Sequence, residues 1–179
     1  MSSKINVTDI LLGHIATLSD PAGNRSIGDY VTFFLVPILV AGLGLLAGYN
    51  LNKDVSSMLV NFGAIFTALL LSVLVLVYDQ ESKLEANKML DPLYSAKKAL
   101  LAQLYYNICF SILSSIVLVA LCFVHSVIFR LTSEITLGTT VFQFGYAKYI
   151  VTPLVIFVTA NLLLTIVMIV KRMHAMLTI

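Results

Sequence analysis

Charged residues are scarce in this sequence, at 11% of its 179 residues against about 25% in an average soluble domain. Four long stretches contain no Asp, Glu, Lys or Arg: residues 30–49, 58–78, 104–129 and 149–170. A water-soluble fold could not bury this apolar surface, because 59% of the residues are hydrophobic. The missing charge therefore excludes an ordinary soluble domain and predicts four membrane-spanning helices.

Metal-ligating residues are equally scarce. The two cysteines, Cys109 and Cys122, fall in one predicted span, so they cannot form a disulfide framework. His125 follows Cys122 by three residues, but apart from Cys109 no other His, Cys, Asp or Glu lies in a span to complete a metal site. The remaining histidines, His14 and His174, lie outside the spans, which also argues against a haem held between two histidines. We therefore expect neither a metal nor a cofactor.

Catalytic signatures are missing as well. The sequence has no G-x-S-x-G motif, no Walker-type glycine loop and no paired acidic residues at membrane depth. Its net charge of +2 is small and dispersed, unlike the basic footprint of a nucleic-acid-binding protein. The sequence thus predicts a non-enzymatic protein that binds no nucleic acid directly.

The fold expected is an all-α membrane protein, a four-transmembrane-helix bundle that forms a single membrane domain over residues 1–179. Before the first span, residues 7–18 predict an amphipathic helix on the membrane surface, the N-terminal interfacial helix. Its apolar stripe would hold Val7, Ile10, Leu11, His14 and Leu18. The imidazole in that stripe would stay wet at the level of the lipid headgroups.

Residues 79–103 predict a cytoplasmic helical hairpin extension between the second and third spans. Helix-forming residues continue to about Leu90, and Asp91-Pro92 reads as the N-cap and first residue of the next helix. That helix would run for about 38 residues, or about 57 Å, against roughly 30 Å of hydrocarbon. The hairpin must therefore project from the membrane.

Three connecting features complete the expected architecture. The first two spans meet in a tight turn, with Asn50 expected as a C-cap and Asp54 as an N-cap. Pro37 and Pro153 each predict a helix kink. The outer loop, residues 130–148, is rich in β-branched and aromatic residues around Leu137-Gly138, which predicts a short β-hairpin.

The distribution of Lys and Arg predicts the orientation. Eight of the eleven lie on the side of the two termini and the helical hairpin, while Lys53, Arg130 and Lys148 lie on the other. We expect a multi-pass protein of the cell (inner) membrane, surrounded by lipid, with both termini in the cytoplasm.

Small and neutral polar residues in the spans are the candidates for helix packing or for contacts between copies of the chain. They are Gly44, Gly48, Asn61, Ala64, Ala68, Asn107, Ser111, Ser115 and Asn161. The alternative use of the three asparagines is to line a pore or a binding cavity.

The projecting hairpin offers the candidates for partner binding. Leu93, Ala96, Leu100 and Leu104 form an apolar stripe that packs either within the hairpin or against another protein. Its charges are of mixed sign, which suits a protein contact better than anionic lipid. The candidates are Glu85, Lys88, Asp91, Lys97 and Lys98.

These features predict a homo-oligomeric membrane component that presents its hairpin to a cytosolic protein, as an anchor, a sensor or a gated pore. The alternative is a transporter or channel subunit for a small solute or ion. In span count, size and cytoplasmic hairpin the chain resembles the small four-span membrane subunits of bacterial anti-phage defence systems, the Kiwa-type membrane proteins. The resemblance implies antiviral defence beside a cytosolic component, and without a shared motif it assigns no residue roles.

Overall fold

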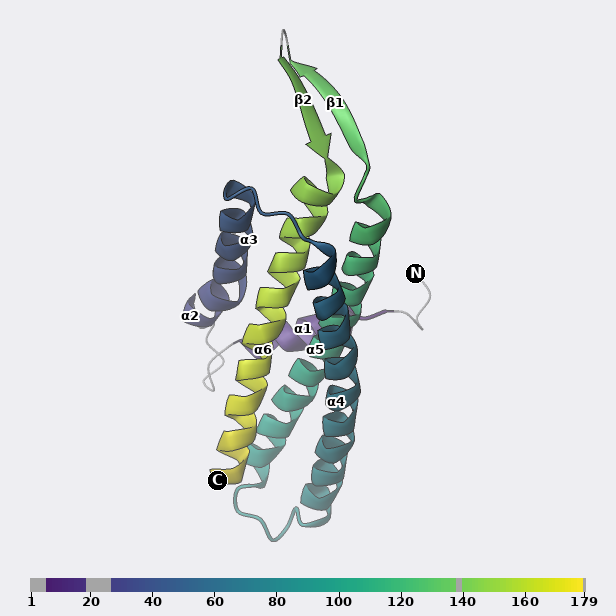
Figure 1. The fold of residues 1–179 in the computed structure, drawn as a ribbon. Helices are drawn as coiled ribbons and strands as arrows, with labels where there is room; N and C mark the ends of the chain where they lie inside the picture. The colour runs from purple at the N-terminus through teal and green to yellow at the C-terminus, as the bar shows by residue number, and fades with distance from the viewer. Residues whose placement is uncertain (1–5, 19–26, 138–139, 179) are drawn as a thin grey trace.

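A computed structural model describes residues 6–18, 27–137 and 140–178, without the side chains of residues 135–142. Most of these residues are helical (Figure 1). The helices are α1 (Thr8–Ala16), α2 (Ile27–Tyr30), α3 (Val36–Leu46), α4 (Lys53–Ala86), α5 (Tyr94–Ile128) and α6 (Thr152–Thr178). Two π-helical turns, η2 (Val31–Leu35) and η3 (Ala147–Val151), lead into α3 and α6.

Four continuous helical segments are long and apolar enough to cross a membrane: Ile27–Leu46, Lys53–Ala86, Tyr94–Ile128 and Ala147–Thr178. Between 17% and 33% of their most apolar windows is buried within the chain, so most of this apolar surface faces outward. Outward-facing apolar surface of this length is what a bilayer covers. The expected four-helix bundle is confirmed, and the segments support a multi-pass membrane protein.

The three longest helices lie side by side, and α3 packs against α6 (Figure 1). Beyond one end of the bundle, β1 (Thr132–Leu137) and β2 (Thr140–Gly145) form an antiparallel hairpin, in which Thr132 pairs with Gly145. We call this the strand end. At the opposite end, the turn end, residues 87–93 join α4 to α5, and α6 finishes nearby. The expected β-hairpin is confirmed, although residues 138–139 at its tip lie outside the described part of the chain.

A seven-residue repeat holds α4 and α5 together. The buried residues of α4 are Ser56, Gly63, Leu70, Val77 and Leu84. Those of α5, apart from Asn107, recur at alternating spacings of three and four residues between Leu101 and His125. This is the repeat that keeps two helices in contact along their length.

The repeat also corrects the apolar stripe expected in the hairpin. Leu101 and Leu104 are buried, whereas Leu93 and Ala96 are exposed. The contact face therefore follows the repeat of α5 and not the run of apolar residues before it.

Helix ends differ slightly from the sequence expectation. Helix α4 ends at Ala86, and α5 begins at Tyr94, because the Asp91 carboxylate accepts a hydrogen bond from the Leu93 N–H (2.9 Å) in an intervening turn. The N-cap of α4 is Asn52 and not Asp54, since the Asn52 side chain accepts from the Val55 N–H (2.8 Å).

Both prolines follow a π-helical turn. Pro37 lies two residues after η2, and Pro153 two residues after η3. Proline has no N–H to bond the carbonyl four residues earlier, and π-helical turns are a common result of such an interrupted ladder. The expected kinks thus take the form of wider helical turns.

Candidate functional site

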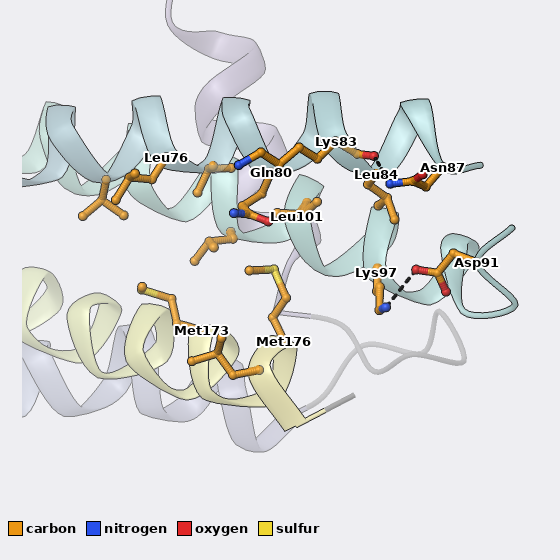
Figure 2. Close-up of a pocket in the computed structure, with 14 residues that line it drawn as sticks. Leu76, Gln80, Lys83, Leu84, Asn87, Asp91, Lys97, Leu101, Met173 and Met176 are labelled. Carbon is orange, nitrogen blue, oxygen red and sulfur yellow. Dashed lines mark hydrogen bonds and ion pairs between the residues drawn. The ribbon is translucent and has the colours of Figure 1, made fainter.

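The clearest hollow that could receive a ligand is a groove at the turn end (Figure 2). Both α4 and α6 pack on α5 but scarcely contact each other, so a space of about 380 Å³ remains between them. Its lining comes from all three helices: Val73, Leu76, Val77, Gln80, Lys83, Leu84, Asn87, Asp91, Lys97, Leu101, Leu104, Met173, Met176 and Leu177. We call this the turn-end groove.

Apolar side chains form most of this groove. Leu84 and Leu101 form part of its floor and belong to the core of the bundle, at 9% and 3% exposure. Leu76 and Leu177, by contrast, are 61% and 82% exposed. Met173 and Met176 project from α6 toward the other two helices (Figure 2). Flexible thioethers of this kind adapt to the shape of a bound partner.

The rim of the groove carries paired charges. Lys97 forms an ion pair with Asp91 (2.8 Å), and Lys83 forms one with Asp79 (2.6 Å). The hydrogen bond from Lys97, followed by that from the Leu93 backbone, lowers the pKa of Asp91 below its usual range. The rim therefore presents both signs of charge in fixed positions, beside the neutral amides of Gln80 and Asn87.

The other three expected partner residues form a separate cluster with Tyr94. Lys98 lies 3.3 Å from the Glu85 carboxylate and donates to the Tyr94 hydroxyl (2.9 Å), which itself donates to Glu85. Lys88 lies 4.0 Å from Glu85. This cluster joins the last turn of α4 to the first turn of α5. Exposed ion pairs of this kind contribute about 0–1 kcal/mol each.

Helix α1 is held against α5 by hydrogen bonds to Asn107. The Asn107 side-chain oxygen lies 2.9 Å from His14 Nδ1 and accepts from the Thr17 hydroxyl at 2.9 Å. The imidazole stacks on Phe110 with ring centroids 3.8 Å apart. A Cβ on Gly13 would lie 2.2 Å from the Tyr106 ring, so only glycine permits this close approach. We call these contacts the α1 anchor.

The α1 anchor corrects the expectation of a wet imidazole. His14 is only 3% exposed, and burial lowers its pKa to about 4, with the Asn107 hydrogen bond opposing the shift and Arg172 adding to it. Arg172 also donates to the Thr17 carbonyl (2.6 Å), which links α1 to α6. The segment that the sequence places on the membrane surface is therefore docked on the bundle through His14, Thr17 and Leu18, which are all buried.

Three further polar candidates in the spans belong to α5 and α6. Asn161 donates to the Phe33 carbonyl (2.8 Å) and so joins α6 to η2. Ser111 and Ser115 are fully buried in α5, where the Ser115 hydroxyl donates to the Ser111 carbonyl (2.9 Å). Ser111 and Ser115 thus lie inside the bundle, whereas Asn161 lines a cavity of about 270 Å³ together with His14 and Phe33.

The two glycines of the first span have different roles. A Cβ on Gly44 would lie 2.9 Å from the Ile156 side chain, so Gly44 belongs to the contact between α3 and α6. Gly48 has a φ of +68° just beyond α3, a conformation that favours glycine at a helix end.

On α4 the small residues predicted from sequence face outward. Asn61, Ala64 and Ala68 are all exposed. The close approach to α5 occurs instead at Gly63, where a Cβ would lie 2.9 Å from Val119 and 3.2 Å from the Ser115 carbonyl oxygen. Sequence reasoning missed Gly63, because a span that is apolar on every side has no stripe that marks its contact face.

The fold and these sites define a class: a bundle of four helices long and apolar enough to span a membrane, with a largely apolar groove at its turn end. Within the described residues, no three His, Cys, Asp or Glu side chains converge as a metal site would require. No protein-family model, curated protein or solved structure matches this chain.

Proposed function

We propose that this protein is a non-enzymatic membrane anchor whose turn-end groove binds an amphipathic helix of a cytosolic protein. The strongest support is exposed apolar surface where no lipid would cover it. Leu177 lies seven residues beyond Val170, about 10 Å past the end of the uncharged stretch of α6, at the same end of the bundle as the buried Leu84 of the groove floor. Leu177 stays 82% exposed there. Exposed apolar surface outside the bilayer is typical of a site that binds another protein.

The chemistry of the groove fits a helix better than a compact polar ligand. Apolar side chains three or four residues apart on one helix would enter between Met173, Met176 and Leu177. Asp91 and Lys97 on the rim would meet charges of opposite sign on the partner, which fixes its direction. A volume of about 380 Å³ holds a few such side chains and not a whole domain.

The proposed orientation places both termini and the turn end in the cytoplasm. Lys83, Lys88, Lys97 and Lys98 all lie on the helical hairpin at that end, in agreement with the positive-inside tendency. In this orientation α1 lies near the cytoplasmic membrane surface, and the β-hairpin lies outside the cell.

A pair of matched double variants tests the groove. Met173→Glu with Leu177→Glu would place two charges in it, whereas Met89→Glu with Leu90→Glu changes exposed residues of the same types that do not line it. A photo-crosslinking residue at Gln80 should capture a discrete cytosolic protein in cells. The first double variant should abolish the crosslink and the second should keep it. Equal crosslinking in both variants would contradict the proposal.

We propose, in addition, that copies of the chain associate through α4. Asn61 is exposed in the uncharged stretch, and its amide has no hydrogen-bond partner among the described residues. A polar group in lipid is costly, and Ala64 and Ala68 would let a second helix approach closely. Ala68→Phe should lower the oligomer size in native mass spectrometry, and Leu69→Phe, exposed about 100° around α4 from Ala68, should not.

Two narrower roles follow from this assembly. A pore would form between copies, because Ser111, Ser115 and Thr165 inside one copy are completely buried. A role in anti-phage defence beside the cytosolic partner is supported only by the resemblance in span count, size and helical hairpin to the membrane subunits of such systems. Plaque counts on bacteria that carry the wild type or the groove variant would test that role.

A further inference from the structure

A second cavity lies at the strand end, between the first turns of α4 and the last turns of α5. Its volume is about 420 Å³, and polar and basic side chains make up most of its lining. The lining residues are Lys53, Ser56, Ser57, His125, Ser126, Val127, Phe129 and Arg130. It lies at the opposite end of α4 from the turn-end groove, so the function proposed above does not use it.

The charge of this cavity is positive. Lys53 from the first turn of α4 and Arg130 from the turn after α5 each contribute a cation, and neither has an ion-pair partner among the described residues. No carboxylate lines the cavity; Asp54 and Glu134, the acidic residues nearest in sequence, do not reach it. The first turn of α4 adds a partial positive charge and the last turn of α5 an opposing negative one, so the positive charge of the cavity rests on the two side chains. An anion is the ligand that this arrangement favours.

A buried imidazole in the lining is a second observation, separate from the charge, that indicates a ligand. His125 is 2% exposed, and its Nε2 has no hydrogen-bond partner within the described chain. Its ring packs edge-on against Phe129, with centroids 5.6 Å apart. Buried polar atoms are rarely left unpaired, and a ligand oxygen in the cavity would satisfy this one.

The cavity also continues toward apolar surface. An adjoining hollow of about 340 Å³ shares Ser56, Ser57 and Ser126 with it, and the rest of its lining is apolar except for Asn61: Val60, Asn61, Val119, Cys122 and Phe123. A basic, hydroxyl-rich end followed by an apolar track has the shape of an anionic amphiphile. Lys53 and Arg130 stand just beyond the uncharged stretches of their helices, at the expected depth of lipid headgroups.

We propose that this strand-end cavity is a phosphate-group site, in which Lys53, Arg130 and His125 hold the headgroup of an anionic phospholipid. The two cations neutralise the phosphate and the imidazole donates a hydrogen bond to one of its oxygens. The acyl chain lies along the adjoining hollow. Free inorganic phosphate shares the chemistry of the headgroup and is the alternative source of the anion.

Native mass spectrometry of the detergent-purified protein, titrated with phosphatidylglycerol, tests the site. Lys53→Gln and Arg130→Gln should each weaken lipid retention about tenfold, as expected for the loss of a charge-assisted hydrogen bond. Lys148→Gln removes a cation at the same end that does not line the cavity, and it should change retention little. Equal losses in all three variants, or none in the first two, would overturn the proposal.

Two further measurements separate binding from folding and identify the source. His125→Phe keeps the aromatic packing and removes the donor, so it should lower lipid retention without lowering the thermal unfolding midpoint. Unchanged retention would remove His125 from the site and overturn the proposed headgroup contact. Inorganic phosphate at millimolar concentration should not displace the lipid if the headgroup is the ligand. Displacement that depends on Lys53 and Arg130 supports the phosphate-group site, with the free anion as its source.

Discussion

The side-chain amide of Asn161 donates a hydrogen bond to the Phe33 carbonyl, which Pro37 leaves without its regular helical donor. A residue four positions beyond a carbonyl normally supplies that N–H, and proline has none. Asn161 and Phe33 lie on different helical segments and are 128 residues apart in the sequence. The fourth span therefore compensates for a break in the first.

This relationship predicts a non-additive pair of substitutions. Asn161→Leu should destabilise the bundle by about 1–2 kcal/mol, because it leaves a buried carbonyl without a donor. In a Pro37→Ala background the loss should shrink, since the alanine N–H can bond Phe33 instead. Unfolding in detergent by thermal or SDS titration measures the four variants. Equal losses in both backgrounds would contradict the relationship.

The approach of α4 to α5 predicts a sharp difference between two glycines. Gly63→Ala should destabilise the bundle by about 1–3 kcal/mol, because the new methyl group would meet Val119 and the immovable Ser115 carbonyl. Gly42→Ala meets nothing within 4 Å and should be neutral or slightly stabilising, since alanine favours a helix. Thermal unfolding midpoints of the two variants decide the matter. Equal effects would mean that Gly63 is not a close contact.

Docking of α1 should depend on pH. The pKa of His14 is about 4 when docked and about 6.5 in the undocked helix. Because the docked state disfavours the protonated imidazole, its stability is complete above about pH 6.5 and falls as the pH drops toward 4, by roughly 3 kcal/mol at most. Hydrogen exchange of residues 8–16 across this range measures the effect.

The control for this pH effect is His14→Phe. The phenyl ring can still stack on Phe110, and Thr17 still donates to Asn107, so α1 should stay docked. Arg172 keeps its charge throughout this range, while any contribution from Asp9 or Asp29 would persist in the variant. A pH dependence that survives His14→Phe would assign the titration to those carboxylates instead.

The proposed orientation predicts the reactivity of the chain ends. In a background in which serine replaces Cys109 and Cys122, a cysteine at residue 2 or after Ile179 should react only with reagents that cross the membrane. A cysteine at Glu134, between the third and fourth spans, should react with impermeant reagents from outside the cell. Labelling of either terminus from outside would reverse the orientation.

The sequence by itself determined the elements that depend on local composition. Uncharged runs long enough for a bilayer gave four spans, and β-branched residues around Leu137-Gly138 gave the β-hairpin. The helical hairpin was also predictable, because Asp91-Pro92 interrupts otherwise helix-forming residues. Its ends shifted by a few residues, since Asp91 caps a turn before Tyr94 and not the helix itself.

Which side of each helix meets a neighbour depended on long-range packing between the helices. A span that is apolar on all sides has no stripe to reveal its contact face. Ala64 and Ala68 were therefore as good candidates for the helix contact as Gly63, which proved to be the close contact. The burial of His14 depends on Asn107, which lies 93 residues away in α5. Both cavities likewise exist only because separate helices converge or diverge in space, a property that no local pattern of residues encodes.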